Sequence, residues 1–246
     1  MGDVIRLNFN RGGFAGHTVD NLLRRAAQLK ISRYERPAAA DSSRFGDIPC
    51  LPESQGWPLC SGCGQPLTFV SQFNLPQLGL ESISEHDLAL FFYCFHCKPF
   101  WDREGRGFFA ALYRNDPLEK LLPLKHMFID NSENAPHVCR VDATLRDDFP
   151  QVAEARELLV LDEAAAENYM SRYQVISSSK IGGWPAWKRL PDTPSCRHCG
   201  GDMTFFAQIA SGEAHGLHFD GEGTLYLFRC SELCRPDAFS LVLQDE

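Results

Sequence analysis

The chain has 246 residues, with 32 acidic side chains against 24 Lys and Arg and a formal net charge of -8. This acidic balance argues against a general nucleic-acid binder, because such proteins gain much of their affinity by neutralising phosphates. Hydrophobic residues make up 44%, which suits an ordinary globular core, and no apolar run approaches membrane-spanning length. The N-terminal residues lack the apolar stretch of a secretory signal, so we expect a cytoplasmic protein whose thiols stay reduced.

The first 43 residues are predicted to be an N-terminal helical segment. Residues 17–30 place apolar side chains on one helical face, and Thr18 is a plausible cap. A loop rich in Pro, Ala and Ser follows at 34–47.

Residues 44–114 form a unit that we call the first repeat. A G-x-x-P turn leads to a C-x-x-C-G knuckle and then to predicted strands at 67–73, 88–94 and 107–114. The second strand runs into another C-x-x-C pair. If the first two strands pair antiparallel, their open ends bring the two cysteine pairs together, where one metal ion clamps the hairpin.

Residues 115–179 are more polar and are predicted to be a helical connecting region. One helix is expected to start near Pro150, and a second to follow Asp162 as its cap. Residues 180–246 then form the second repeat, with the same order of parts and predicted strands at 203–209, 224–230 and 238–244.

The two repeats are related by a constant offset of 136 residues. Adding 136 to positions 60, 63 and 94 gives the cysteines at 196, 199 and 230, and only the fourth cysteine slips by one residue. Between residues 46–72 and 182–208 nine positions are identical without a gap, most of them Gly, Pro, Cys and aromatic. Such residues answer special backbone needs, so the repeats are expected to share a backbone path and, because each is small, one core.

Eight of the ten cysteines fall into two sets of four, which predict two structural zinc ions. Four thiolates fill the four positions of tetrahedral Zn²⁺ and leave none open for water or substrate. Gly64 and Gly200 follow the knuckles and allow the positive φ that such a turn needs. With eight thiolates and two zinc ions the formal charge becomes -12. The predicted ligands are Cys60, Cys63, Cys94 and Cys97 in the first set and Cys196, Cys199, Cys230 and Cys234 in the second.

Two other uses of these cysteines are open. Disulfides would need an oxidising compartment, and thiol redox motifs usually open a helix, whereas strand-like sequence follows both knuckles. Cys50 and Cys139 are expected to be small buried apolar residues, and His96 and His198 to be spacers within the cysteine pairs.

Other chemistry is weakly marked. His215, His218, Asp220 and Glu222 lie close together and form either a metal or general-base cluster or a Gly-rich turn, which we favour. Residues 98–114 mix basic and aromatic side chains, as single-stranded nucleic-acid sites do, but a strand with solvated charges is the more ordinary interpretation. The sequence has no G-x-S-x-G, phosphate-loop or H-E-x-x-H motif.

The residues Lys180, Gly182, Gly183, Pro185 and Trp187 open the second repeat, and Gln208, Ile209, Asp220, Gly223, Tyr226 and Phe228 follow later in it. With these residues the second repeat resembles the YwqG-like family of uncharacterised bacterial proteins. That family shows a K-x-G-G-x-P-x-W opening, an L-x-Q-I strand and a G-D-x-G-x-x-Y-x-F strand, and in this chain the Asp is displaced to D-G-E-G. The cysteine-bearing arrangement also resembles, at a distance, the programmed cell death protein 2 group, whose members are implicated as chaperones of a ribosomal protein. The second resemblance implies a zinc-stabilised binding protein rather than an enzyme.

The sequence as a whole predicts an α+β fold that is internally duplicated, with mainly antiparallel short strands, a few helices and two zinc-clamped hairpins. We expect a cytoplasmic protein-interaction module without a catalytic constellation, which holds a basic protein partner in a groove shaped by the G-x-x-P turns, Gln72 and Gln208. The alternative is an uncharacterised enzyme or ligand-binding protein that uses the His215–Glu222 region.

Overall fold

The computed structural model describes residues 18–34, 39–97, 105–116, 119–130, 132–219 and 221–245. Its elements are η1 (Val19–Leu22), β1 (Arg24–Arg33), β2 (Arg44–Phe45), η2 (Glu53–Gln55), β3 (Thr68–Asn74), β4 (Leu88–Tyr93), β5 (Phe108–Tyr113), η3 (Leu124–His126), β6 (Cys139–Asp148), α1 (Val152–Leu159), α2 (Glu163–Arg172), β7 (Lys180–Gly182), β8 (Met203–Ala210), β9 (Thr224–Cys230) and β10 (Phe239–Gln244).

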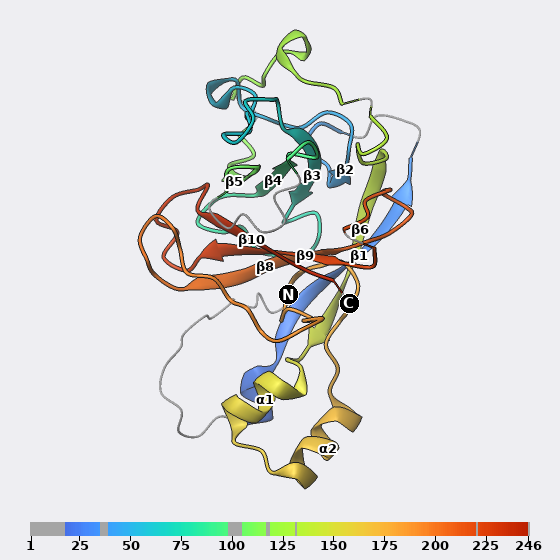
Figure 1. Ribbon diagram of the computed structural model, residues 1–246, viewed down its shortest axis with the longest axis vertical. Helices are drawn as coiled ribbons and strands as arrows, with labels where there is room; N and C mark the ends of the chain where they lie inside the picture. Colours follow the sequence, from blue (N-terminus) through green and yellow to red (C-terminus); the bar gives the residue numbers. More distant parts are fainter. Residues whose placement is uncertain are drawn as a thin grey trace, which may run out of the picture.

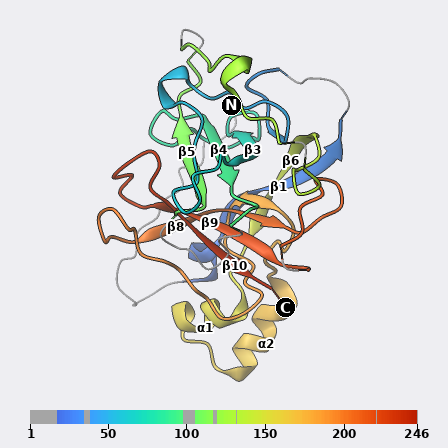
Figure 2. The same ribbon diagram turned by 45° about the horizontal axis from the view of Figure 1, so that its top comes forward.

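Ten strands of the described residues form one antiparallel sheet in the order β10-β9-β8-β7-β1-β6-β2-β3-β4-β5. The outermost strands β5 and β10 contact each other, so the sheet is nearly closed. Figures 1 and 2 show α1 and α2 together at one end of the molecule, away from β3, β4 and β5. The predicted α+β class, with mainly antiparallel strands and a few helices, is confirmed.

The duplication runs through the sheet, because strands β2 to β5 and β7 to β10 occupy equivalent places on either side of the central pair β1 and β6. Strand β1 precedes the first repeat but pairs with β7 of the second, and β6 precedes the second repeat but pairs with β2 of the first. Between them β1 and β6 pair over ten residues, from Arg24 opposite Asp148 to Arg33 opposite Cys139. Each repeat therefore contributes a leading strand to the other.

The predicted hairpins and third strands are confirmed in both repeats. Strands β3, β4 and β5 pair in succession, as do β8, β9 and β10. The same irregularity interrupts both hairpins, between Phe69 and Ser71 in β3 and between Phe205 and Ala207 in β8, which are 136 residues apart. A bulge bends its strand at a defined residue, so the two repeats share backbone geometry and not only sequence.

A buried glutamine at the same place in each repeat ties the hairpin to the loop before it. The Oε1 of Gln72 accepts the backbone N–H of Cys50 at 2.7 Å, and that of Gln208 accepts the N–H of Ala186 at 2.9 Å. Each Nε2 donates to carbonyl groups of the loop that precedes β2 or β7. Both side chains are fully buried, so neither offers a surface to the groove that we expected them to help shape. Burial without loss of hydrogen bonds makes them structural anchors instead.

The helix predicted over residues 17–30 is wrong. The described part of this stretch holds the short 3-10 helix η1 and then strand β1, whose Ala26, Ala27 and Leu29 are buried in the centre of the sheet. The apolar residues Ala27, Leu29 and Ile31 occupy alternate positions, as in a strand. The apolar residues between 17 and 30 also fit one face of a helix, so the sequence pattern is compatible with both. Pairing with β6 and β7 decides between the two, because non-local contacts override local propensity.

The connecting region holds the two predicted helices and one strand that was not predicted. Helix α2 begins after Asp162, whose Oδ1 accepts the backbone N–H of Ala165 at 2.8 Å, so the predicted cap is confirmed. Helix α1 begins two residues after Pro150, with Gln151 as its cap. The missed strand is β6, in which Cys139, Val141, Ala143 and Leu145 alternate as a strand requires.

The main core draws on both repeats, as expected for two small units that share one interior. Phe73 and Phe91 come from the first, Phe206 and Leu227 from the second, and Val141 from β6. Three smaller clusters lie under the first knuckle, under the second knuckle and beneath the helices.

Candidate metal centres

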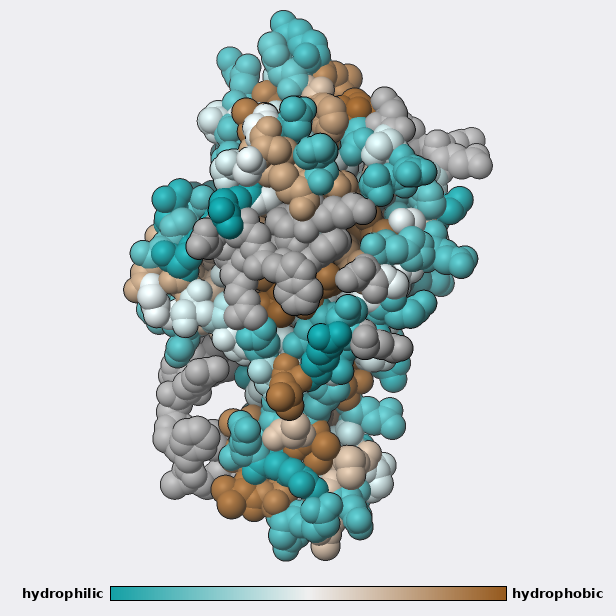
Figure 3. Space-filling view, in the orientation of Figure 1, coloured by the Kyte–Doolittle hydropathy of each residue, from teal (hydrophilic) through white to brown (hydrophobic). Residues whose placement is uncertain are grey.

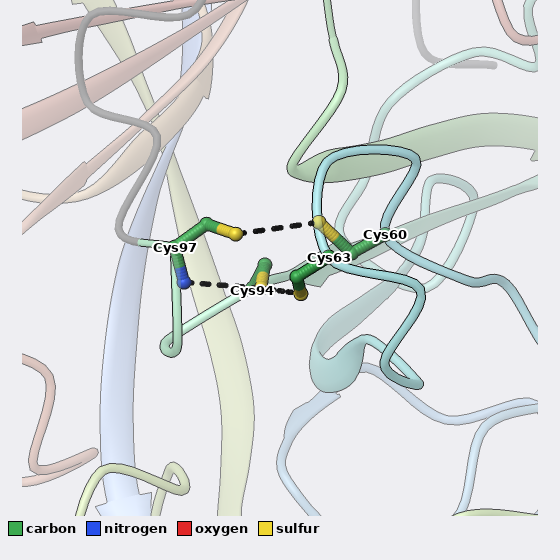
Figure 4. Close-up of side chains that lie close together, drawn as sticks. All are labelled: Cys60, Cys63, Cys94 and Cys97. Atoms are coloured by element: carbon green, nitrogen blue, oxygen red, sulfur yellow. Dashed lines mark hydrogen bonds between the residues drawn. The ribbon is translucent and has the colours of Figure 1, made fainter.

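The first set of four cysteines meets at the open end of the β3–β4 hairpin (Figure 4). The Sγ of Cys60 lies 3.8 Å from that of Cys97, and the Sγ of Cys63 lies 3.7 Å from that of Cys94. Tetrahedral zinc with bonds of about 2.3 Å to sulfur would separate its ligands by about 3.8 Å. We call this group the first tetrad, and its spacing fits such an ion.

The second set repeats the arrangement at the open end of the β8–β9 hairpin. The Sγ atoms of Cys196 and Cys234 are 3.7 Å apart, and those of Cys199 and Cys230 are 3.6 Å apart. In both tetrads the first cysteine lies beside the fourth and the second beside the third. Within each tetrad all sulfur atoms lie within 4.8 Å of one another, and these two tetrads are the groups of this kind among the described residues.

Each knuckle is shaped by two backbone hydrogen bonds and one glycine. The N–H of Cys60 donates to the carbonyl of Gln65 at 2.8 Å, and the N–H of Gly64 returns to the carbonyl of Cys60 at 2.7 Å. Cys196 and Gly200 make the matching pair of bonds at 2.8 and 2.7 Å. The φ angles of Gly64 and Gly200 are +72° and +73°, which favour glycine because they are left-handed.

The extra residue before the last cysteine is absorbed by a left-handed turn. Leu233 stands between Cys230 and Cys234 with a φ of +47°, and its N–H donates to the carbonyl of Cys230 at 3.2 Å. One strained residue lets Cys234 reach the position that Cys97 occupies in the first tetrad. The one-residue slip in the sequence therefore leaves the geometry of the site intact.

The four thiols of a tetrad do not share one acidity. In the first tetrad, the backbone N–H of Gln65 lowers the pKa of Cys63 to about 7, while the adjacent Cys63 sulfur raises the pKa of Cys97 to about 12.

The second tetrad shows the same spread. Burial raises the pKa of Cys196, but the N–H groups of Cys199 and His198 outweigh it and bring it to about 7. Burial and the Cys230 sulfur raise the pKa of Cys234 to about 12. Four sulfur atoms this close cannot all ionise without a cation between them, so full ionisation requires a bound metal ion.

The sulfur positions also bear on the rival uses of these residues. All ten cysteines are described, and all are free thiols. Sulfur separations of 3.6–3.8 Å are far from a disulfide bond length of about 2.05 Å. Both knuckles run into strands, β3 and β8, and not into a helix that would lower a thiol pKa for redox work.

The remaining cysteines and the spacer histidines lie outside the tetrads. Cys50 and Cys139 are buried, as predicted, and the Sγ of Cys139 donates to the carbonyl of Ala214 at 3.0 Å. Burial raises the pKa of both thiols. His96 and His198 belong to neither ligand group.

The described residues of the histidine-rich segment in the second repeat do not gather into one site. His215 is buried, stacks on Phe45 at 4.8 Å, and accepts the N–H of Leu217 at its Nδ1. Burial lowers its pKa to about 4, so the ring is neutral at physiological pH. His218 and Glu222 are exposed, and Asp220 lies outside the described residues. The described members of this segment therefore support a packed turn, with His215 joining the two repeats.

A buried ion pair anchors the opening of the second repeat, and sequence reasoning did not find it. The Nζ of Lys180 lies 2.7 Å from the Oδ2 of Asp148, and both side chains are fully buried. Asp148 also accepts the N–H groups of Ile176 and Trp184, each at 2.7 Å. A Cβ at Gly183 would lie 2.1 Å from that Oδ2, so the second glycine of the K-x-G-G opening leaves room for the carboxylate. The lysine was visible in the motif, but its partner lies 32 residues away on β6.

Comparison with known proteins places the chain in a protein family. Among the described residues, no helix is both long enough and apolar enough to cross a membrane. No curated protein matches the sequence. A family model described as a domain of unknown function, DUF1963, matches residues 43–243, which span both repeats and both tetrads. The chain therefore belongs to the DUF1963 family.

Proposed function

We propose that the chain is a zinc-stabilised, cytoplasmic protein-interaction module that holds a basic protein partner. The proposal takes the ions to be zinc because eight thiolates in two tetrahedral sets suit it better than harder metals. Four sulfur ligands close each site, so the ions would stabilise the hairpins and not activate water. Function then has to lie on the surface of the scaffold.

The observation that carries this proposal is a set of exposed apolar side chains on the first repeat and the loop after it. Leu59 is 61% exposed on the first knuckle, and Leu124 and Ile129 are 64% and 51% exposed around η3. Phe128, also exposed, lies 6.5 Å from the ring of Trp57, which links this loop to the repeat. Figure 3 shows apolar groups over the upper part of the molecule, where the first repeat lies. Such gatherings mark protein interaction surfaces.

The charge of the molecule favours a basic partner. An open cavity of about 480 Å³ lies at the end of β3 away from the first tetrad, and Asp41 and Asp87 line it. Within the described part of the chain neither carboxylate has an ion-pair partner; Asp41 accepts a hydrogen bond from Asn115 at 2.9 Å. A net charge of -8 adds a long-range attraction for cationic partners. The distant resemblance to the programmed cell death protein 2 group, with its ribosomal client, points the same way.

The test is an affinity capture with matched surface variants. Leu124→Asp with Ile129→Asp places charge in the apolar surface, whereas Val160→Asp with Leu190→Asp changes two apolar residues that are each 81% exposed elsewhere. We expect one basic protein to bind the unchanged chain and the control reproducibly, and to be lost with the first pair. Equal capture by both pairs, or no reproducible basic partner, would contradict the proposal.

A further inference from the structure

Residues 105–108, which lead into β5, lie between the two knuckles. On one side the first knuckle binds them: the N–H of Ser61 donates to the carbonyl of Arg106 at 2.8 Å, and its Oγ donates to the same oxygen at 3.2 Å. The N–H of Cys94, a ligand of the first tetrad, donates to the carbonyl of Gly107 at 2.8 Å. We call residues 105–108 the shared segment.

On the other side the second knuckle packs against the same segment. The guanidinium carbon of Arg197 lies 5.9 Å from the centre of the buried Phe108 ring, within the range of a cation–π contact. A Cβ at Gly105 would lie 1.8 Å from Nη1 of Arg197, so the guanidinium rests directly on that backbone. Arg197 is the counterpart of Ser61 at the offset of 136. The same position of each knuckle therefore reaches one segment.

A second connection leaves the second tetrad. Pro236 comes two residues after Cys234, and its carbonyl accepts the N–H of Leu112 in β5 at 3.0 Å. This bond lies where the edge strands β5 and β10 meet and the sheet nearly closes. The loops of the second tetrad thus hold β5 from both ends of the strand.

We propose that the two metal centres are coupled through the shared segment, so that each ion binds more tightly when the other centre is filled. A filled second tetrad fixes Arg197 against residues 105–108 and Pro236 against Leu112 of the strand that follows them. Both contacts hold the shared segment in place for Ser61 and Cys94 of the first tetrad. The effect is reciprocal, because each ion must change the affinity for the other by one common factor, typically about 5- to 150-fold. This inference rests on the zinc binding proposed above and does not depend on a protein partner.

Native mass spectrometry during stepwise removal of zinc by a chelator tests the coupling on the full chain. For two equal, independent sites the one-zinc species reaches about half of the protein at half-loading, and a 25-fold coupling reduces it to about one sixth. We expect a one-zinc share well below half for the unchanged chain. Arg197→Ala should raise this share towards half, and Arg197→Lys should raise it less.

Arg140→Ala is the matched control, since it removes an exposed cation whose ion pair with Asp142 lies within strand β6 and not in a loop of either tetrad. It should leave the one-zinc share unchanged. An equal one-zinc share with and without Arg197 would overturn the coupling while leaving the metal sites in place. A chain that carries no zinc would instead contradict the metal assignment itself.

Discussion

The two repeats agree in how they bring four cysteines together and differ in how they are anchored. At equivalent positions, Arg44 in β2 pairs with Asp47 of its own loop at 3.4 Å, whereas Lys180 in β7 pairs with Asp148 from a distant strand at 2.7 Å. The carboxylate of Asp47 is 23% exposed, and that of Asp148 is fully buried. The knuckles, bulges and buried glutamines are the same in both repeats. The cation at the equivalent position, Arg44 or Lys180, pairs with a carboxylate from a different part of the chain in each repeat. The geometry around the cysteine tetrads is therefore the more constant feature of the two repeats, and the ion pair that anchors each repeat is the more variable one.

The largest expected difference between the repeats comes from the two ion pairs. Asp148→Asn leaves a buried ammonium without its counter-charge and should lower the free energy of unfolding by about 3 kcal/mol. Asp47→Asn should lower the free energy of unfolding by about 1 kcal/mol or less. Arg44 still donates hydrogen bonds to the carbonyl groups of Ser42 and Ile48, and the ion pair that is lost is partly exposed to solvent. Urea unfolding with excess zinc measures both, and equal losses would contradict the asymmetry.

A second difference should appear with pH. His215 of the second repeat has no titrating counterpart, since position 79 of the first is glycine. Its folded pKa, about 4, lies below the unfolded value of 6.5, so the unfolded chain binds more protons between these pH values. Stability from His215 is therefore present above pH 6.5 and lost as pH falls towards 4, by up to about 3 kcal/mol.

The His215 effect is isolated by comparing stability against pH for the unchanged chain and His215→Gln. Burial raises the pKa of Glu154 to about 7, so the folded chain holds this proton more tightly than the unfolded chain. The contribution of Glu154 to the stability of the protein therefore increases as pH falls, and it partly masks the loss that His215 causes in the same pH range. Because Glu154 is present in both proteins, the difference between the two curves reports His215 alone. A difference that does not change between pH 6.5 and 4 would show that the ring is not buried as described.

The smallest expected effect on stability comes from the knuckle glycines, and it should be equal in the two repeats. Gly64→Ala and Gly200→Ala each force a Cβ into a left-handed turn but meet no neighbouring atom within 4 Å. Each should lower stability by about 1 kcal/mol, the cost of the backbone conformation alone. Unequal losses from thermal unfolding of the two variants would mean that the knuckles are less alike than their hydrogen bonds indicate.

Local spacing made the cysteine tetrads and the hairpins predictable. A C-x-x-C-G knuckle followed by a strand, and a second strand that ends in cysteine, fix both tetrads without knowledge of the rest of the chain. The cap at Asp162 is equally local. Each of these features depends on residues that lie close in sequence or at the ends of one hairpin.

The features that were predicted wrongly or missed all depend on contacts between distant parts of the chain. Residues 24–33 satisfy a helical pattern as well as an alternating one, and only the partners β6 and β7 select the strand. The exchange of β1 and β6 between the repeats, and the pairing of Lys180 with Asp148, leave no local mark. The alternation of apolar residues in β6 was present in the sequence, but its polar surroundings concealed it.

The central claim is that each tetrad binds one zinc ion through sulfur alone. Zinc content combined with X-ray absorption at the zinc edge tests it most directly on protein purified without chelator. We predict two zinc ions per chain, each surrounded by four sulfur atoms at about 2.3 Å. A chain that purifies without zinc, or zinc bound through nitrogen or oxygen, would contradict it.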